Sequence, residues 1–364
     1  MVLRYERIKT VLCLVICIGL VCGTLALGDR TAVACQEVFE YINSASAEFT
    51  ATSTVYNNGN TQEVYISGYG GGGYGGATAS SVPSDISALM EQAESMYAGF
   101  TKSGDIEETR LGASPLTTTY GVVDIDNKTD EAVDIQALLN TKPSFGNITK
   151  NEPYILIYHT HSTEGYELLD KGWYSDEYVS RTEDTAKNMI RVGDELTLAL
   201  EEAGFTVIHD RNIYDKSYNG AYDRSRVMVE QYLQEYPSIV LTLDVHRDAI
   251  HYDDGTKCKP TATVNGKKAA QVMIISGCEG DGVTDFSRWK ENLTFAVHLQ
   301  NQVEESYEGV MRPIFFCNRK YNMNVTPCSL LLEFGTDANT LEEAVYSARL
   351  IGDSLGELLN KNAG

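Results

Sequence analysis

The feature that most constrains the fold is a regular alternation of strand-like and helix-like stretches in the second half of the chain. The strand-like runs are short and apolar, and the runs between them repeat their apolar residues with the period of a helix. Strands that alternate with helices build a mostly parallel sheet with helices on both faces. We therefore predict an α/β domain over residues 151–364. The strand-like runs are residues 154–158, 205–210, 238–246, 269–276 and 329–335, and the helix-like runs are residues 184–204, 225–237, 292–307 and 340–359.

Reactive side chains accompany three of these predicted strands. The run YILIY is followed by HTHSTEGY, which places His159, His161 and Glu164 just beyond one strand. His246 ends the run SIVLTLDVH, and Glu333 lies in the run SLLLEFG. Because ligands of parallel sheets bind beyond the carboxyl ends of the strands, we expect these five side chains to meet at one edge of the sheet.

The types of these residues match zinc-dependent hydrolysis. That chemistry needs three protein ligands, an open coordination position and a carboxylate that accepts a proton from water. We predict that His161, Glu164 and His246 bind Zn²⁺, and that Glu333 is the general base and later the acid to the leaving nitrogen. A glutamate in an apolar strand is costly unless it is paired, protonated or functional. An ion pair between Glu333 and Arg247 is the structural alternative.

We also predict roles for three polar residues that lie close in sequence to the proposed zinc ligands. Arg247 is predicted to bind a carboxylate or to stabilise a tetrahedral oxyanion, and Asp248 to orient a histidine. An internal ion pair between Arg247 and Asp248 is the alternative. His159 is either a further ligand or a group that orients His161 or contacts substrate. The other histidines lack a comparable context, and we expect structural or surface roles for His209, His251 and His298.

The N-terminus has the pattern of a membrane anchor. Residues 10–28 carry no charge and follow Arg4, Arg7 and Lys9. This length is close to the ~20 residues with which a helix crosses a bilayer. The positive charges predict that residues 1–9 stay in the cytoplasm and that the catalytic domain is extracytoplasmic, on a single-pass protein of the cell membrane. A cleaved signal peptide is the alternative, because the stretch TLALGD offers small residues near a cleavage position.

Two segments separate this anchor from the α/β domain. Residues 29–83 are predicted to form an extracytoplasmic stalk, in which the glycine-rich residues 68–76 (GYGGGGYGG) form a flexible linker. Residues 84–150 are predicted to precede the catalytic domain as a smaller segment. It starts with a helix over residues 84–100 and contains a strand end, a turn and a short helix within residues 124–140.

Charge and cysteine usage exclude some classes of function. The formal net charge is −22, and such an acidic surface repels nucleic acid, so we exclude nucleic-acid binding. The cysteines of the second half lack C-x-x-C spacing, which excludes a zinc knuckle. We expect free buried thiols, with one or two disulfides as the alternative in an exported domain. These cysteines are Cys258, Cys278, Cys317 and Cys328.

Five motifs resemble the stage II sporulation protein P (SpoIIP) family of endospore-forming bacteria. They are ILIYHTHSTEGY, NMIRVGDELTLALEEAGFTVIHDR, SYNGAYDRSR, LDVHRDA and YNMNVTPCSLLLEFGTDANTLEEA, in family order over about residues 120–358. The resemblance implies a membrane-anchored peptidoglycan hydrolase of engulfment with the fold of zinc-dependent N-acetylmuramoyl-L-alanine amidases. It implies cleavage of the amide between muramic acid and L-alanine, with endopeptidase cleavage as a second activity. The implied partners are a SpoIID-like lytic transglycosylase and a SpoIIM-like membrane protein.

The identity of the acidic ligand and the bond that is cleaved both have alternatives. In the wider amidase superfamily the acidic ligand starts the helix after the first histidine, which points to Asp184 or Glu183. The spacing His161-x-x-Glu164 instead resembles zinc carboxypeptidases, and we predict Glu164. One rival function is a zinc carboxypeptidase that trims wall stem peptides, with Arg247 binding the terminal carboxylate. The other is a wall-binding scaffold without catalysis.

Overall fold

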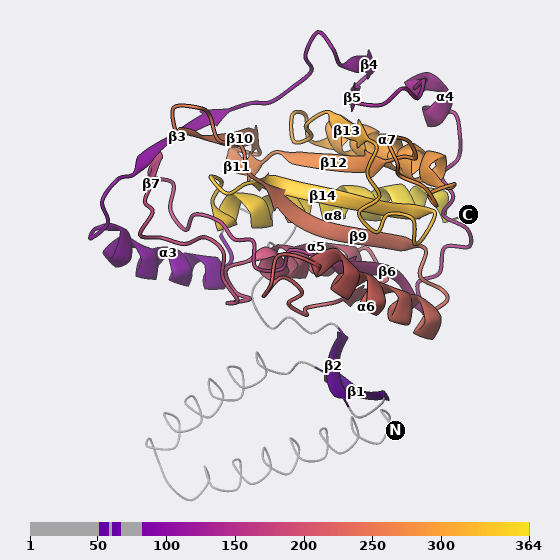
Figure 1. Ribbon diagram of the computed structural model, residues 1–364, viewed down its shortest axis with the longest axis horizontal. Coiled ribbons are helices and arrows are strands. Elements are labelled where there is room, and N and C mark those ends of the chain that lie inside the picture. The colour runs from indigo at the N-terminus through magenta and orange to yellow at the C-terminus, as the bar shows by residue number, and fades with distance from the viewer. Residues whose placement is uncertain (1–50, 58–59, 67–81, 364) are drawn as a thin grey trace, which may run out of the picture. The chain divides into compact units, whose positions relative to one another are not determined.

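The computed structural model describes residues 51–57, 60–66 and 82–363 (Figure 1). The predicted anchor at residues 10–28 and the predicted linker at residues 68–76 lie outside the described residues. Strands β1 (Ala51–Asn57) and β2 (Asn60–Ile66) pair as an antiparallel hairpin. Among the helices of the described ranges, none combines the length and the apolar character that a membrane crossing requires.

The larger sheet in the described part of the chain has eight strands in the order β4-β5-β13-β12-β14-β9-β6-β8 (Figure 1). Strands β14, β9, β6 and β8 run parallel to one another, and so do β5, β13 and β12. The two parallel blocks meet at the antiparallel pair β12 and β14. The strands are β4 (Thr118–Tyr120), β5 (Val123–Asn127), β6 (Pro153–Tyr158), β8 (Thr206–His209), β9 (Leu241–Asp248), β12 (Val272–Gly277), β13 (Ile314–Cys317) and β14 (Cys328–Thr336).

The antiparallel junction follows from the connection between β13 and β14. Parallel neighbours need a crossover, usually a helix, whereas residues 318–327 between these two strands contain no helix. The chain therefore returns in the opposite direction and β14 pairs with β12. The prediction of an α/β fold with a largely parallel sheet is confirmed, and the sheet is mixed.

Helices cover the two faces of the sheet to different extents. Alternate residues of β6 separate the faces: Ile155 and Ile157 enter the main core with α5, α7 and α8, and Leu156 and Tyr158 pack in a smaller core with α6. We call the first the closed face and the second the open face. The helices are α5 (Met189–Glu202), α6 (Ala221–Glu235), α7 (Trp289–Ser306) and α8 (Leu341–Asn362).

Capping residues explain where two of these helices begin. The side chain of Asn188 accepts the backbone N–H of Ile190 at the start of α5. Thr340 and Glu343 form a capping box at the start of α8, in which each side chain accepts the other residue's backbone N–H. Helix α5 ends at Glu202 with Ala203 as its C-cap, and Gly204 follows with a φ of +94°, a conformation that favours glycine.

A smaller sheet arises from a region that the sequence analysis left irregular. Its order is β11-β10-β3-β7 among the described residues, and β10 contains the buried Lys259. Because Lys259 Nζ lies 3.0 Å from Glu343 and 2.9 Å from Asp170, the lysine is paired inside the protein and breaks the apolar pattern of the strand. The strands are β3 (Gly104–Thr109), β7 (Trp173–Tyr174), β10 (Lys257–Val264) and β11 (Lys267–Ala270), and the remaining helices are α3 (Ser84–Tyr97) and α4 (Ile135–Leu139).

The cysteines of the described ranges are free and buried. Cys258, Cys278, Cys317 and Cys328 are all nearly inaccessible to solvent. Burial raises the pKa of the Cys317 thiol to about 11, so it stays protonated and unreactive at neutral pH. The prediction of free buried thiols is confirmed for these four residues.

Candidate active site

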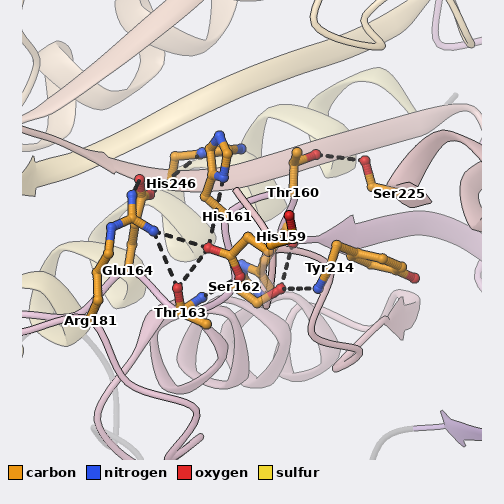
Figure 2. Close-up of polar contacts among 12 residues, drawn as sticks. His159, Thr160, His161, Ser162, Thr163, Glu164, Arg181, Tyr214, Ser225 and His246 are labelled. Carbon is orange, nitrogen blue, oxygen red and sulfur yellow. Dashed lines mark hydrogen bonds and ion pairs between the residues drawn. The ribbon is translucent and has the colours of Figure 1, made fainter. Parts of the chain in front are cut away.

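The loop after β6 begins at the carboxyl end of the strand and carries His161 and Glu164 next to His246 (Figure 2). Thr160 fixes this turn, because its backbone N–H and its hydroxyl both donate to the carboxylate of Asp244 on β9, at 2.8 and 2.7 Å. The hydroxyl of Ser162 donates to the backbone carbonyl of His159 at 2.8 Å. The loop is therefore held by buried hydrogen bonds rather than by apolar packing alone.

Glu164 lies among positive and hydrogen-bond-donating groups (Figure 2). Its Oε2 is 3.6 Å from Nδ1 of His246 and accepts the backbone N–H of Arg247 at 3.2 Å. Its Oε1 accepts from Nη2 of Arg181 at 2.9 Å. Burial opposes ionisation, but the interactions with His246, Arg247 and Arg181 outweigh it and hold the pKa of Glu164 below its ordinary value. Glu164 is therefore a buried carboxylate.

His246 is held between two carboxylates. Its Nε2 lies 2.7 Å from Oδ1 of Asp244, outside hydrogen-bond geometry, while its Nδ1 faces Glu164. Burial alone would lower the pKa of His246. The negative charges of Asp244 and Glu164 outweigh burial and raise this pKa well above the ordinary value. A carboxylate behind an imidazole fixes the orientation of the ring.

His161 lies next to His246, with 5.4 Å between the ring centroids and an angle of 86° between the ring planes. Its Nδ1 is 3.8 Å from Oδ2 of Asp215, is buried, and has no hydrogen-bond partner within the described part of the chain. Burial opposes a charge on Asp215, but the interactions with His161 and Thr163 lower its pKa. His161 therefore offers a buried nitrogen that the protein itself does not satisfy.

Glu333 lies on the neighbouring strand, in register with His246 across the β14–β9 pair. Its Oε2 is buried and has no hydrogen-bond partner among the described residues. Burial raises the pKa of Glu333 to about 8, and the negative charge of Glu164 contributes to the increase. A carboxyl group that holds its proton near neutral pH is suited to proton transfer.

The fit of this site to a metal ion can be tested on its donor atoms. Two ligands of one tetrahedral zinc at ~2.1 Å are about 3.4 Å apart, and Nδ1 of His246 is 3.6 Å from Oε2 of Glu164. The unpartnered Nδ1 of His161 is a donor of the right kind. These atoms fit zinc in chemistry and in one pairwise spacing, although no group of three or more His, Cys, Asp or Glu side chains in the described ranges forms a closed metal cluster.

His159 lies apart from the site, on the closed face. Its Nδ1 is 2.9 Å from the carbonyl of Val245 and its Nε2 is 2.8 Å from Nε2 of His209. Helix α5 crosses this pair at Gly193, where a Cβ would lie 2.6 Å from Nε2 of His159. Both ring nitrogens of His159 are therefore engaged, and neither faces His161 or His246.

Arg247 and Asp248 are turned away from the zinc-ligand candidates. Nε of Arg247 donates to the carbonyl of Gly165 at 2.8 Å, so its guanidinium holds the loop, and only its backbone N–H contacts Glu164. The carboxylate of Asp248 pairs with Arg312 at 2.9 Å. Arg247 and Asp248 do not form the predicted side-chain ion pair with each other; Nη1 of Arg247 donates to the backbone carbonyl of Asp248.

The alternative acidic ligands lie elsewhere on the surface. Asp184 is 2.8 Å from Nζ of Lys187, and Glu183 is 2.9 Å from Nζ of Lys216. The remaining histidines are also outside the site: His251 contacts Asp337, and His298 contacts the carbonyl of Thr141.

Three side chains of the site were missed by the sequence analysis. Asp244 is two residues before His246 on a buried strand, so the period of two already placed both on one face. Asp215 and Arg181 had no such signal, because they enter from irregular loops, where Nη1 of Arg181 lies 3.0 Å from Oδ2 of Asp215.

A groove of about 440 Å³ borders Glu333 on the open face. Met273, Ile275 and Phe315 form its apolar floor on β12 and β13. The segment between β3 and β4 contributes Ser114 and Thr117 to the opposite wall. The carboxyl of Glu333 therefore faces a space in which part of a substrate can bind.

The fold and the site define an α/β protein with a mixed, largely parallel sheet and a buried histidine–carboxylate site at one sheet edge. The chain belongs to the family described as stage II sporulation protein P (SpoIIP), whose sequence model matches residues 92–356. It is 30% identical over 222 residues to "Stage II sporulation protein P" of Bacillus subtilis (strain 168), which is 58% of this chain and 52% of that protein. The chain thus spans about half the length of the curated relative it matches.

Two solved amidases have a distant structural likeness to this chain. The amidase AmiC2 of Nostoc punctiforme matches with 10% identity and a TM-score of 0.33, over 58% of this chain and 94% of that chain. The CwlD amidase of Clostridioides difficile, solved in complex with the GerS lipoprotein, matches with 12% identity and a TM-score of 0.34, over 57% of this chain and 99% of that chain. Likenesses at these values carry no argument about mechanism.

Proposed function

We propose that this protein is a zinc-dependent N-acetylmuramoyl-L-alanine amidase that degrades peptidoglycan during sporulation. Membership of the SpoIIP family supports a role in sporulation. The observation that carries the chemistry is the convergence of buried, incompletely satisfied groups at one sheet edge, next to a groove. His246 faces Glu164, His161 has an unpartnered nitrogen, and Glu333 has an unpartnered oxygen.

His161, Glu164 and His246 would hold the zinc ion, which supplies Lewis acidity at the scissile amide when it is bound. The chain itself prepares these ligands. Asp244 lies beside Nε2 of His246, the nitrogen that does not face Glu164, and Oδ2 of Asp215 lies 3.8 Å from Nδ1 of His161. Glu164 stays ionised because of His246, Arg247 and Arg181, whereas the raised pKa of His246 means that this ring releases a proton when a cation binds.

Glu333 is the proposed proton carrier. It accepts a proton from the attacking water and then donates it to the nitrogen that leaves as the amide breaks. Burial raises the pKa of Glu333 to about 8, so without a metal ion the carboxyl group is mostly protonated at neutral pH. A bound cation would lower this pKa and favour the first step.

The geometry gives less support to the carboxypeptidase alternative. That activity needs a cation that is free to bind a terminal carboxylate, and the sequence analysis assigned this task to Arg247. The guanidinium of Arg247 is occupied by the carbonyl of Gly165 and by the loop around it. Neither this alternative nor a scaffold without catalysis is favoured by a specific contact of the site.

The cellular setting belongs to the same proposal. We infer a single-pass protein of the cell membrane, with residues 10–28 as its anchor and the catalytic domain outside. Peptidoglycan is the proposed substrate, with cross-link cleavage as a second activity. The proposed partners are a SpoIID-like lytic transglycosylase and a SpoIIM-like membrane protein, as the family resemblance implies.

Digestion of purified sacculi tests the proposed function. The full-length chain should release intact stem peptides, leave new N-terminal alanine and peptide-free glycan, and contain close to one zinc per chain. The Glu333→Gln variant is the matched control, since it keeps the size of the side chain and removes the proton carrier. Release of single amino acids would identify a carboxypeptidase, digestion by metal-free protein would exclude the zinc chemistry, and binding without any cleavage would identify a scaffold.

A further inference from the structure

Three tyrosines form a wall beside the candidate zinc ligands. Tyr218 stacks on His161 with 4.5 Å between the ring centroids and 4° between the planes. Tyr222 lies 6.3 Å from His246 at 9°, and Tyr321 lies 5.2 Å from Tyr222. We call Tyr218, Tyr222 and Tyr321 the tyrosine wall. They belong to the motifs SYNGAYDRSR and YNMNVTP, to which the proposed zinc chemistry assigns no role.

The outermost ring of this wall faces solvent. Tyr218 is 63% exposed, although one side of its ring rests on His161. The inner end of the wall is held by strained backbone, because Tyr321 and Asn322 have φ values of +40° and +60°, which non-glycine residues seldom adopt. The amide of Asn322 donates to the carbonyl of Tyr222 at 3.0 Å and ties the two motifs together. The chain thus builds and exposes an aromatic surface next to the site.

The outer end of the tyrosine wall, Tyr218, and the groove lie on opposite sides of the His246–Glu333 pair. Tyr218 stacks on His161, which follows β6, and the floor of the groove belongs to β12 and β13. In the sheet order, β14 and β9, which carry Glu333 and His246, separate β12 from β6. A substrate that crosses the reacting centre therefore meets tyrosine rings on one side and the groove on the other.

We propose that the glycan strand of the substrate binds on the tyrosine wall and that its stem peptide binds in the groove. This inference rests on the proposed function, because it assigns the two halves of a muramoyl–alanine amide to the two sides of one site. It makes Tyr218 and the groove floor specificity-determining elements for the same reaction.

The chemistry of each side matches its assigned ligand. A sugar ring has an apolar C–H face and a rim of hydroxyls, and a tyrosine offers an apolar ring with a polar tip to bind both. The groove is of the size of small-ligand sites, and Arg312 and Asp248 border its apolar floor with polar groups that can accompany the backbone of a peptide. The leaving nitrogen carries the stem peptide, so the peptide must lie on the side of Glu333, which donates the proton.

Binding measurements with two half-substrates test this orientation in the full-length chain. The probes are peptide-free glycan strands and free stem peptide that begins with L-alanine, and neither contains the scissile bond. Tyr218→Ala should weaken glycan binding by ~3- to 10-fold, the range expected for one aromatic contact, and should leave peptide binding unchanged. Tyr252→Ala is the matched control, because Tyr252 is 40% exposed and lies outside the wall.

The groove is tested by filling it. Met273→Trp, from the floor, should abolish peptide binding and leave glycan binding unchanged. Ser114→Trp is a second variant from the exposed wall, for the case in which Met273→Trp fails to fold. Val227→Trp, at an exposed position of α6 outside the groove, is the control for the added bulk.

The outcomes separate this proposal from the proposed function. Loss of peptide binding in Tyr218→Ala, or of glycan binding in Ser114→Trp, would reverse the orientation and overturn the proposal. Unchanged glycan binding in Tyr218→Ala would overturn it as well. Zinc content is measured in every variant, since a fall in Tyr218→Ala would show that the ring only supports His161. A wild-type chain that binds both probes on these two sides but cleaves no sacculi would keep the orientation and refute the amidase.

Discussion

His159 and His161 are two residues apart in the sequence and belong to opposite sides of the sheet. On the closed face, His159 has both ring nitrogens engaged, by the carbonyl of Val245 and by His209. On the open face, the buried Nδ1 of His161 has no hydrogen-bond partner. The two imidazoles have the same chemistry and nearly the same burial, and they differ in whether the protein satisfies them.

This difference separates structural polar groups from functional ones. Buried polar groups in native proteins are nearly always satisfied, because an unsatisfied one costs about 1–3 kcal/mol. The open face leaves Nδ1 of His161 and Oε2 of Glu333 without a hydrogen-bond partner among the described residues, and we infer that another group satisfies them during function. On the closed face both ring nitrogens of His159 are engaged, although Oδ2 of Asp194, beside His209, also has no hydrogen-bond partner among the described residues.

The largest expected effect comes from removing the imidazole of the open face. His161→Ala should lose its zinc and bring sacculus digestion below detection, while circular dichroism stays close to that of the wild type. Because the ring is buried and stacks on Tyr218, a modest fall of the unfolding midpoint should accompany the loss of zinc. A variant that keeps both zinc and activity would show that His161 is neither a zinc ligand nor needed for catalysis.

The second effect concerns the unsatisfied carboxyl. Glu333→Gln should retain zinc and fold, and its kcat on sacculi should fall by ~10²- to 10⁴-fold, as expected when a general base or acid is removed. Metal analysis and turnover are measured on the same preparation. Turnover within a few fold of the wild type would show that Glu333 is a buried acid without a catalytic role.

Substitution of His159, on the closed face, should lower stability and leave zinc binding and activity unchanged. His159→Ala removes two ring hydrogen bonds and leaves a cavity under α5, which should lower the free energy of unfolding by roughly 2–5 kcal/mol. Urea denaturation measures this loss. Zinc content and activity per folded molecule should stay near the wild-type values, and a loss of zinc in this variant would return His159 to the ligand set.

A smaller effect is expected from His209 in acid. Burial lowers the pKa of His209 to about 4 from an ordinary value of 6.5, so between these pH values the unfolded chain binds a proton that the folded chain does not. Stability therefore falls as the pH decreases from 6.5 to 4. His209→Gln should make the fall shallower, as read from urea midpoints at pH 7, 6 and 5. Parallel curves for the two proteins would contradict the buried neutral imidazole.

The smallest effect is expected at the alternative acidic ligand. Asp184→Asn breaks a surface ion pair with Lys187 and should change stability by less than about 0.5 kcal/mol, with zinc and activity retained. Glu164→Gln is the comparison variant and should lose zinc. Loss of zinc in Asp184→Asn together with retained zinc in Glu164→Gln would show that Asp184 is the acidic ligand.

The sequence predicted the fold where apolar periodicity was strong. The helices later found as α5, α7 and α8 and the strands found as β6, β9, β12 and β14 coincide with the periodic runs within a few residues. Strand β10 was missed because its buried Lys259 is paired by residues distant in the sequence, which no local pattern records. The apolar pattern also did not predict that β14 runs antiparallel to β12. That direction depends on the loop between β13 and β14 and not on the residues of the strand.

The candidate site could be predicted only in part, for a related reason. His161, Glu164, His246 and Glu333 were found because they interrupt or end apolar strands. The face of the sheet on which His159 lies depends on how the chain turns after β6. The alternation of residues in β6 does not predict this turn, because the alternation stops where the strand ends. Asp215 comes from a loop, where the sequence offers no period to count.

The position of β14 in the sheet has a consequence for the order in which the protein is made. This strand follows all other strands of the described chain, yet it lies between β9 and β12 and joins the two parallel blocks. A growing chain that ends before Cys328 has neither the joint between the blocks nor Glu333. The proposed hydrolase therefore stays inert throughout its synthesis, and a destructive activity is withheld until nearly the whole polypeptide has emerged.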